Sequence, residues 1–247
     1  MNRQLPCLAA ALLLALHCGS IAAQDVADGH DTGSPQLVSL AEAFNDWLAS
    51  NRPVTPHAVL RRSRPAGWDP DWSQSAIQKR KTEYLQFQGR QKAISTLGFD
   101  TADRIDAAIL GANMARVHWS LEVLDRPRRD PGFYLDQSLG SLFEVLVRAP
   151  EPGASDIEEL IRRLHRFPPL INAAKLQLEE VVGALAEETI ARIDDVDARA
   201  DAFDTALSPY VSDHLRYDFN VGMRAMRQSL TTYKDWLTLS LDRFNEP

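Results

Sequence analysis

Residues 163–178 of this 247-residue chain read RLHRFPPLINAAKLQL, with a double proline in the middle of their apolar pattern. Leu164 and Phe167 follow a helical spacing, whereas Pro168 and Pro169 each lack a backbone N–H and clash with the preceding turn. A helix axis must kink or restart at such a point. The stretch therefore predicts two consecutive helices joined at Pro168, with Leu164 in the core.

A helix start precedes this stretch. In the sequence Ser155-Asp156-Ile157-Glu158, the Ser155 hydroxyl and the Glu158 carboxylate can each satisfy a free backbone N–H, as in a capping box. We therefore expect the first of the two helices to begin at Ser155.

Helical periodicity continues on both sides of this pair, from Ser73 almost to the end of the chain. One helix is expected to stop at Gly98, with an apolar face of Ile77, Tyr84, Phe87, Ile94 and Leu97. The next is expected to start at Asp100 or Thr101, with an apolar face of Ile105, Ala108, Ile109, Ala112, Trp119 and Val123. No window alternates like a strand, so we predict an all-α fold, a multi-helix bundle or array.

The remaining helices follow from the same pattern. A basic loop is expected over residues 125–132, and then a helix with the apolar residues Leu135, Leu139, Leu142, Phe143 and Leu146. A single helix is expected from Ile190 to Leu207. After Pro209, apolar residues from Val211 to Phe244 keep helical spacing and predict one long helix.

The first part of the chain has the features of an export signal. Arg3 is followed by the apolar run Leu8–Leu16 and by small residues that favour cleavage after Ala22 or Ala23. We expect a signal peptide at 1–23, a flexible leader at 24–36 and one helical domain at 37–247. The proline-rich stretch at 52–72 is expected to be an ordered connector or a linker, and four apolar residues suggest that it packs: Val59, Leu60, Trp68 and Trp72. The mature protein is expected in the periplasm or medium, without a membrane segment.

Both cysteines, Cys7 and Cys18, lie inside the expected signal, so the mature chain has no disulfide and no cysteine ligand. Cys18 suggests a lipoprotein as an alternative, although His17 stands where a small residue is expected.

The net charge of −7 argues against general nucleic-acid binding, which depends on phosphate neutralisation. Basic clusters at 61–64 and 126–129 are interpreted as solvated loops, with an anion site as the alternative.

Catalytic and metal-binding motifs are absent from the sequence. No P-loop, nucleophile elbow or dinucleotide glycine motif is present, and no two of the histidines are four residues apart, as a zinc helix requires. Those outside the signal are His30, His57, His118, His165 and His214. No catalytic, cofactor-binding or metal-binding residue is assigned, and no cofactor is expected.

Weaker candidates have simpler structural interpretations. The pairs His118/Glu122 and His214/Asp218 are four residues apart and can each supply two metal ligands, but a helix-surface contact is favoured. The acidic run at 194–204 lacks the spacing and glycine of a calcium loop, so a solvated helix face is favoured. Four aromatic residues can line a groove or fill the core, and the core is favoured: Trp119, Tyr134, Tyr210 and Trp236.

Two groups of residues carry a resemblance to a known family. Arg163-Leu164, Phe167-Pro168, Leu170, Ala174 and Leu178 resemble the pattern R-L-x-x-I-P-x-L-x-x-x-A-x-x-x-L, and Arg128-Arg129-Asp130-Pro131 with Tyr134 is similar to W-x-R-D-P-x-x-Y without its tryptophan. Both patterns belong to the bacterial family called domain of unknown function 885. Its members are all-α, often exported, and similar to zinc metallopeptidases through a His-Glu-x-x-Pro-Gly-His motif in their C-terminal half.

No position of this chain matches that zinc motif, so the resemblance transfers no catalytic residue. It implies the N-terminal helical portion of such a protein, which would form a channel wall without holding metal. Three functional hypotheses follow: a non-catalytic exported helical domain, a subunit or fragment of a metallopeptidase whose zinc half is a separate chain, and a module that binds peptides or a small ligand.

Overall fold

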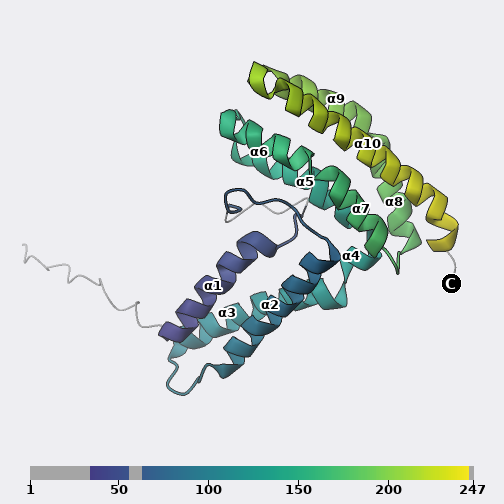
Figure 1. The fold of residues 1–247 in the computed structure, drawn as a ribbon. Helices are drawn as coiled ribbons and strands as arrows, with labels where there is room; N and C mark the ends of the chain where they lie inside the picture. Colours follow the sequence, from purple (N-terminus) through teal and green to yellow (C-terminus); the bar gives the residue numbers. More distant parts are fainter. Residues whose placement is uncertain (1–33, 56–62, 245–247) are drawn as a thin grey trace, which may run out of the picture. The chain divides into compact units, whose positions relative to one another are not determined.

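The computed structural model describes residues 34–55 and 63–244, and these ranges contain helices and no strands. The all-α prediction is therefore confirmed (Figure 1). The expected signal peptide and residues 24–33 of the expected leader lie outside the described ranges.

In chain order the elements are α1 Pro35–Asn51, α2 Gln74–Ala93, α3 Thr101–His118, the π-helical turn η1 Trp119–Val123, α4 Arg126–Arg129, α5 Pro131–Arg148, α6 Ala154–Leu164, α7 Phe167–Gln177, α8 Gly183–Asp194, α9 Val196–Leu207, the 3-10 turn η2 Ser208–Tyr210 and α10 Asp213–Phe244.

A small core lies between α1, α2 and α3, which run beside one another (Figure 1). It consists of Leu37, Leu40, Phe44, Tyr84, Phe99, Leu110 and Met114. The start of α1 is fixed by α3, since the backbone N–H of Ser34 donates to Asp103 at 2.8 Å. Proline suits the first turn of a helix, and α1 accordingly begins at Pro35, two residues before the expected start of the helical domain at residue 37.

A larger core is built from α5 to α10, and α10 contacts α6, α7, α8 and α9 (Figure 1). Phe133 and Tyr134 of α5, Leu164 of α6 and Tyr233 of α10 are almost fully buried in it. The Tyr233 hydroxyl donates to the carbonyl oxygen of Pro131 at 2.9 Å, which ties the last helix to the start of α5.

The predicted break at the double proline is confirmed. Helix α6 ends at Leu164, and α7 begins at Phe167 with both prolines in its first turn, where their missing N–H groups cost no helical hydrogen bond. Leu164 is buried as predicted. It faces Gly222 of α10, where an added Cβ would lie 2.9 Å from the Leu164 Cβ.

The predicted capping box at Ser155 is wrong. Helix α6 begins at Ala154, and the Asp156 carboxylate accepts the backbone N–H of Gly153 at 3.1 Å. Gly153 is the N-cap, because its backbone is extended and its carbonyl oxygen accepts the first helical hydrogen bonds. The acidic residue in the third helical position is therefore Asp156 instead of Glu158.

The predicted apolar face of the helix after Asp100 is also wrong. Asp100 caps α3 as expected, by accepting the N–H of Asp103 at 2.8 Å. The buried residues, however, are Asp103, Leu110 and Met114. The predicted residues Ile105, Ile109, Trp119 and Val123 are exposed. Two stripes on this helix have suitable spacing, and the one that contacts α1 and α2 is buried.

Helix ends differ from expectation at two further places. Helix α2 ends at Ala93 because Ile94 is extended, so Gly98 lies in a later turn with a φ of 91° and Leu97 is exposed. The expected single helix from Ile190 to Leu207 is divided at Asp195, which occupies the N-cap position of α9. The Asp195 side chain makes no capping hydrogen bond, and its carboxylate accepts from Arg199 instead.

On α5, the expected apolar residue Phe143 is exposed, whereas Leu142 and Val145 are buried. The expected loop at 125–132 contains α4 and the first turn of α5.

The described part of the connector packs against the helices, whereas Val59 and Leu60 lie outside the described residues. Trp68 and Trp72 are buried. Val54 and the Gln137 side chain exchange two hydrogen bonds, of 2.8 and 2.9 Å. Arg80 lies over the Trp72 ring, and burial lowers the pKa of its guanidinium to about 10, which leaves it charged at neutral pH.

Among the described residues, no helix has the combination of length and apolar character needed to cross a membrane.

Candidate functional site

The best candidate site is a cavity of about 320 Å³ between the end of α1 and the junction of α3 with η1. Its volume lies at the lower end of the range for small-molecule sites. The lining is mainly apolar, with amide, hydroxyl and guanidinium groups among the apolar side chains. The residues are Trp47, Leu48, Asn51, Arg52, Pro53, Thr55, Asn113, Arg116, Val117, Ser120 and Leu121.

One wall is the C-terminal turn of α1. Trp47 is fixed there because its indole N–H donates to the Glu83 carboxylate at 2.8 Å and its ring packs on Phe44 and Phe87. Asn51 is held by donation of its side-chain amide to the Trp47 carbonyl oxygen at 3.0 Å. The helix ends at Asn51 because Arg52 is extended ahead of Pro53.

The facing wall is the last part of α3 and the π-helical turn η1. The N–H of Leu124 donates to the carbonyl oxygen of Trp119 at 2.9 Å, five residues earlier, as a π-helix requires. The next residue, Asp125, has a φ of 40°, which is uncommon for a residue other than glycine. Single π turns occur often at functional sites, and this one supplies Ser120 and Leu121 to the cavity.

The charged groups in this lining are guanidinium groups. Burial lowers the pKa of Arg52, and the neighbouring Arg64 acts in the same direction, while Glu144 opposes both. Arg116 is exposed on α3. The described lining contains no aspartate, glutamate or histidine, and so it offers donors and apolar surface but no general base.

A second cavity, of about 490 Å³, is polar and lies between α4, the start of α5 and α8. At its centre the buried Asp136 carboxylate accepts from Arg126 at 3.1 Å and from Arg192 at 2.6 Å. Arg126 also donates to Asp130 at 2.8 Å. Asp130, Asp136, Arg126 and Arg192 are therefore paired with one another, which favours a structural role for these four residues.

A third cavity, of about 270 Å³, is apolar and lies between α5, α9 and α10. It is lined by Leu139, Leu142, Phe143, Leu146, Val196, Arg199, Ala200, Phe203 and Met226. Arg199, its charged group, pairs with Asp195 at 3.1 Å.

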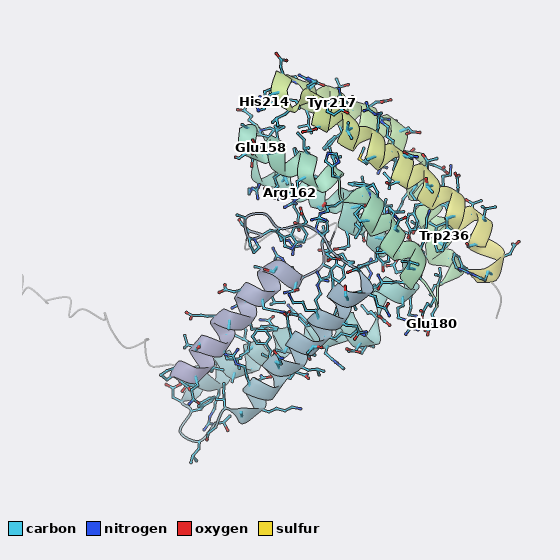
Figure 2. All side chains as sticks on the ribbon, viewed as in Figure 1. Glu158, Arg162, Glu180, His214, Tyr217 and Trp236 are labelled. Carbon is cyan, nitrogen blue, oxygen red and sulfur yellow. The ribbon has the colours of Figure 1, made fainter. Side chains whose placement is uncertain are left out.

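The structure does not bring the candidate metal ligands together. Glu122 pairs with Lys81 at 3.3 Å, while the His118 ring packs beside Tyr84. His214 is exposed at one end of α10, far along the helix from Trp236 (Figure 2). His30 and His57 lie outside the described residues.

Within 34–55 and 63–244, no group of three or more His, Cys, Asp or Glu side chains is placed to hold a metal ion. The described residues therefore do not fit a zinc site of the kind found in the family that the signature residues resemble, and no zinc-dependent step is assigned to them.

The acidic run at 194–204 is exposed but ion-paired. Asp194 contacts Lys234, and Arg227 pairs with Asp201 at 2.6 Å and with Asp197 at 3.6 Å. The run is therefore solvent-exposed, as predicted, and its ion pairs also join α8 and α9 to α10.

The two basic clusters are likewise not simple solvated loops. Arg64 is buried over the Trp68 ring and makes two contacts of 3.1 Å with Glu144. Arg128 pairs with Glu179 at 3.0 Å and with Glu180 at 2.8 Å. Arg61 and Arg62 lie outside the described residues.

The four candidate aromatic residues do not share a groove. Tyr134 is buried and donates to the Pro127 carbonyl oxygen at 3.0 Å, and its burial raises the pKa of its hydroxyl. Trp236 packs between Tyr233 and Phe244. Trp119 and Tyr210 are exposed.

The residues that resemble the family signature are buried in the larger core. Arg163 donates to the Ser141 carbonyl oxygen and to Glu159, and burial lowers the pKa of its guanidinium while Glu159 and Glu144 oppose that shift. The other signature positions pack among apolar side chains: Leu164, Phe167, Leu170, Ala174 and Leu178. This placement indicates that these residues have a structural role, in the packing of the larger core.

Comparisons with known proteins bear on the fold alone. No family model matches the chain, and no curated protein matches it. The structure is similar to a solved structure from Shewanella oneidensis described as "a putative lipoprotein of unknown function", with a TM-score of 0.67 and 12% sequence identity. The match covers 84% of this chain and 38% of that one, so this chain spans well under half the length of the protein it matches.

Proposed function

We propose that this protein is a helical binding domain and that the cavity between α1, α3 and η1 takes a small, largely apolar ligand. The observation that carries the proposal is the lining itself, in which apolar side chains surround a few fixed polar groups. The described lining lacks an acid–base pair, which favours binding over catalysis.

The test is calorimetric titration of the purified protein with 1-octanol, a neutral probe whose size suits the cavity. We expect saturable binding that Val117→Trp weakens at least tenfold, because Val117 lines the cavity and a larger side chain would fill it. Val147→Trp is the matched control, since Val147 is an exposed valine on α5. Circular dichroism would check that both variants fold, and equal binding by both would refute the proposed site.

We further propose that the chain corresponds to the helical portion of a longer peptidase-like protein or of a two-chain assembly. The resemblance at 163–178 supports this, and so does the match to part of a longer structure. A reading frame immediately downstream that encodes the His-Glu-x-x-Pro-Gly-His motif is the expected result for a two-chain enzyme. Its absence there would contradict the two-chain form.

We also propose that the protein is exported. The order of Arg3, the apolar run Leu8–Leu16 and the small residues before Gln24 supports export, as does the likeness to a structure described as a lipoprotein. N-terminal sequencing of the protein from cell fractions should find a start at Ala23 or Gln24 outside the cytoplasm. A cytoplasmic product that retains Arg3 would contradict export.

A further inference from the structure

We propose that the ligand of the cavity between α1, α3 and η1 is a small monocarboxylate with an apolar body, and that Arg116 binds its carboxylate. This inference rests on the proposed binding function and names the chemical class of the ligand. Its basis is the sign of the charge around the cavity and the spacing of the donors along α3.

The lining is electrically one-sided. It contains the guanidinium groups of Arg52 and Arg116, and its described part contains no carboxylate. Arg52 already has an interaction partner, so Arg116 is the cationic group that we assign to the ligand. An apolar cavity with a cationic group at its wall favours an amphipathic anion over a neutral or cationic ligand of the same shape.

Arg116 is the arginine of this lining that is available to a ligand. It is exposed, and it makes no ion pair with another residue in the described ranges. By contrast, Arg126, Arg128 and Arg162 each pair with a carboxylate. The residues one helical turn from Arg116 also include no acid: Ala112, Asn113, Trp119 and Ser120.

The donors near Arg116 share one face of the helix. Asn113 lies three residues before it and Ser120 four residues after it, and both line the cavity. An amide, a guanidinium and a hydroxyl therefore follow one another along one wall. A carboxylate can accept two parallel hydrogen bonds from a planar guanidinium, which a hydroxyl or an amine cannot do.

The volume limits the apolar part of the ligand. At about 30 Å³ for each water-sized group, 320 Å³ holds about ten non-hydrogen atoms. This size suits a medium-chain aliphatic acid or a compact aromatic acid. Trp47, Leu48, Val117 and Leu121 supply the apolar contact.

Calorimetric titration with three probes of matched chain length tests the inference: octanoate, 1-octanol and octylamine. An aromatic acid of similar size, 3-phenylpropionate, distinguishes an aliphatic from an aromatic source of the carboxylate. We expect the wild-type protein to bind at least one of the two acids at least tenfold more tightly than 1-octanol, and octylamine most weakly.

The variant Arg116→Gln should remove the preference for the acids and leave the affinity for 1-octanol within twofold of wild type. Arg116→Lys should retain part of the preference, because it keeps the charge but loses the paired donors. Arg104→Gln is the matched control, since Arg104 is exposed on the same helix outside the lining, and it should bind all probes as wild type does.

The outcomes separate the two proposals. If 1-octanol binds in the cavity but neither acid binds more tightly, or if Arg116→Gln keeps the preference, the carboxylate inference is wrong and the binding function stands. If none of the four probes binds, both proposals fail.

Discussion

The two cores of this protein differ in how many helices pack against one another in them. In the larger core, α10 packs against α6, α7, α8 and α9 and is hydrogen-bonded to the start of α5. The buried Arg163 guanidinium donates through its two terminal nitrogens, although its Nε has no hydrogen-bond partner among the described residues. In the small core, α3 buries Leu110 and Met114 but leaves Ile105 and Ile109 exposed, and a cavity with polar groups in its lining lies beside its end. The larger core borders an apolar cavity between α5, α9 and α10. Regions with fewer buried contacts open more easily, and binding sites are often found in them. We therefore expect the larger core to contribute more to stability, and the proposed ligand site lies beside the smaller one.

The largest expected effect comes from Leu164→Ala in the larger core. Leu164 is fully buried against Gly222, so its truncation leaves a cavity and should lower the free energy of unfolding by about 2–5 kcal/mol. Urea denaturation followed by circular dichroism measures this change. An unchanged midpoint would mean that α6 does not contribute to the main cooperative unit.

Leu40→Ala is the same change in the small core, where Leu40 is equally buried. We expect about 2–3 kcal/mol, the lower part of the range, because a smaller core can relax around the deleted group. Hydrogen exchange should show faster exchange in α1 and α3, with α10 unchanged. Loss of protection in α10 as well would mean that the two cores unfold together and would remove the contrast between them.

Asp136→Asn tests the polar border of the larger core. The substitution keeps the shape of the side chain but removes the charge that accepts from Arg126 and Arg192, so it should cost about 1–3 kcal/mol. Asp195→Asn is the control, because the Asp195–Arg199 pair is exposed and should contribute less than about 0.5 kcal/mol. Equal effects in thermal unfolding would show that burial of Asp136 does not strengthen its ion pairs.

The smallest expected effect is that of Ile109→Gln. Ile109 lies on the exposed side of α3, so its loss should change the free energy of unfolding by less than about 0.5 kcal/mol. The neighbouring Leu110→Ala should cost about 2 kcal/mol or more, since Leu110 is buried. A larger effect for Ile109→Gln than for Leu110→Ala in the same denaturation experiment would mean that the helix face predicted from the sequence is the buried one.

The sequence predicts helix content and breaks better than it predicts helix faces. Pro168 and Asp100 act through local backbone chemistry, and the structure confirms both. The face of α3 depends instead on what packs against it, and its two apolar stripes have equally good spacing. The division at Asp195 was missed because the periodicity of Ile190, Ile193 and Val196 continues through it.

The candidate site was not predictable in the same way. Its residues come from the end of α1, the connector after it and the α3–η1 junction, so no single stretch carries a recognisable spacing. The π turn has no periodic pattern that separates it from an α-helix. One signal was present: Asn113, Arg116 and Ser120 share a helix face without an acid among them. These three residues indicate a site only when the structure shows that Trp47, at the end of α1, lines the same cavity.

The hydrogen bond from Tyr233 to Pro131 implies an order of assembly. These residues are 102 positions apart, so the larger core cannot close until α10 has joined it. Contacts between such distant residues form late, since closing a long chain segment costs entropy. The buried members of the small core end at Met114, and Val117 packs against them. A chain that emerges N-terminus first can therefore bury the small core while the apolar sides of α5 and α6 are still without α10.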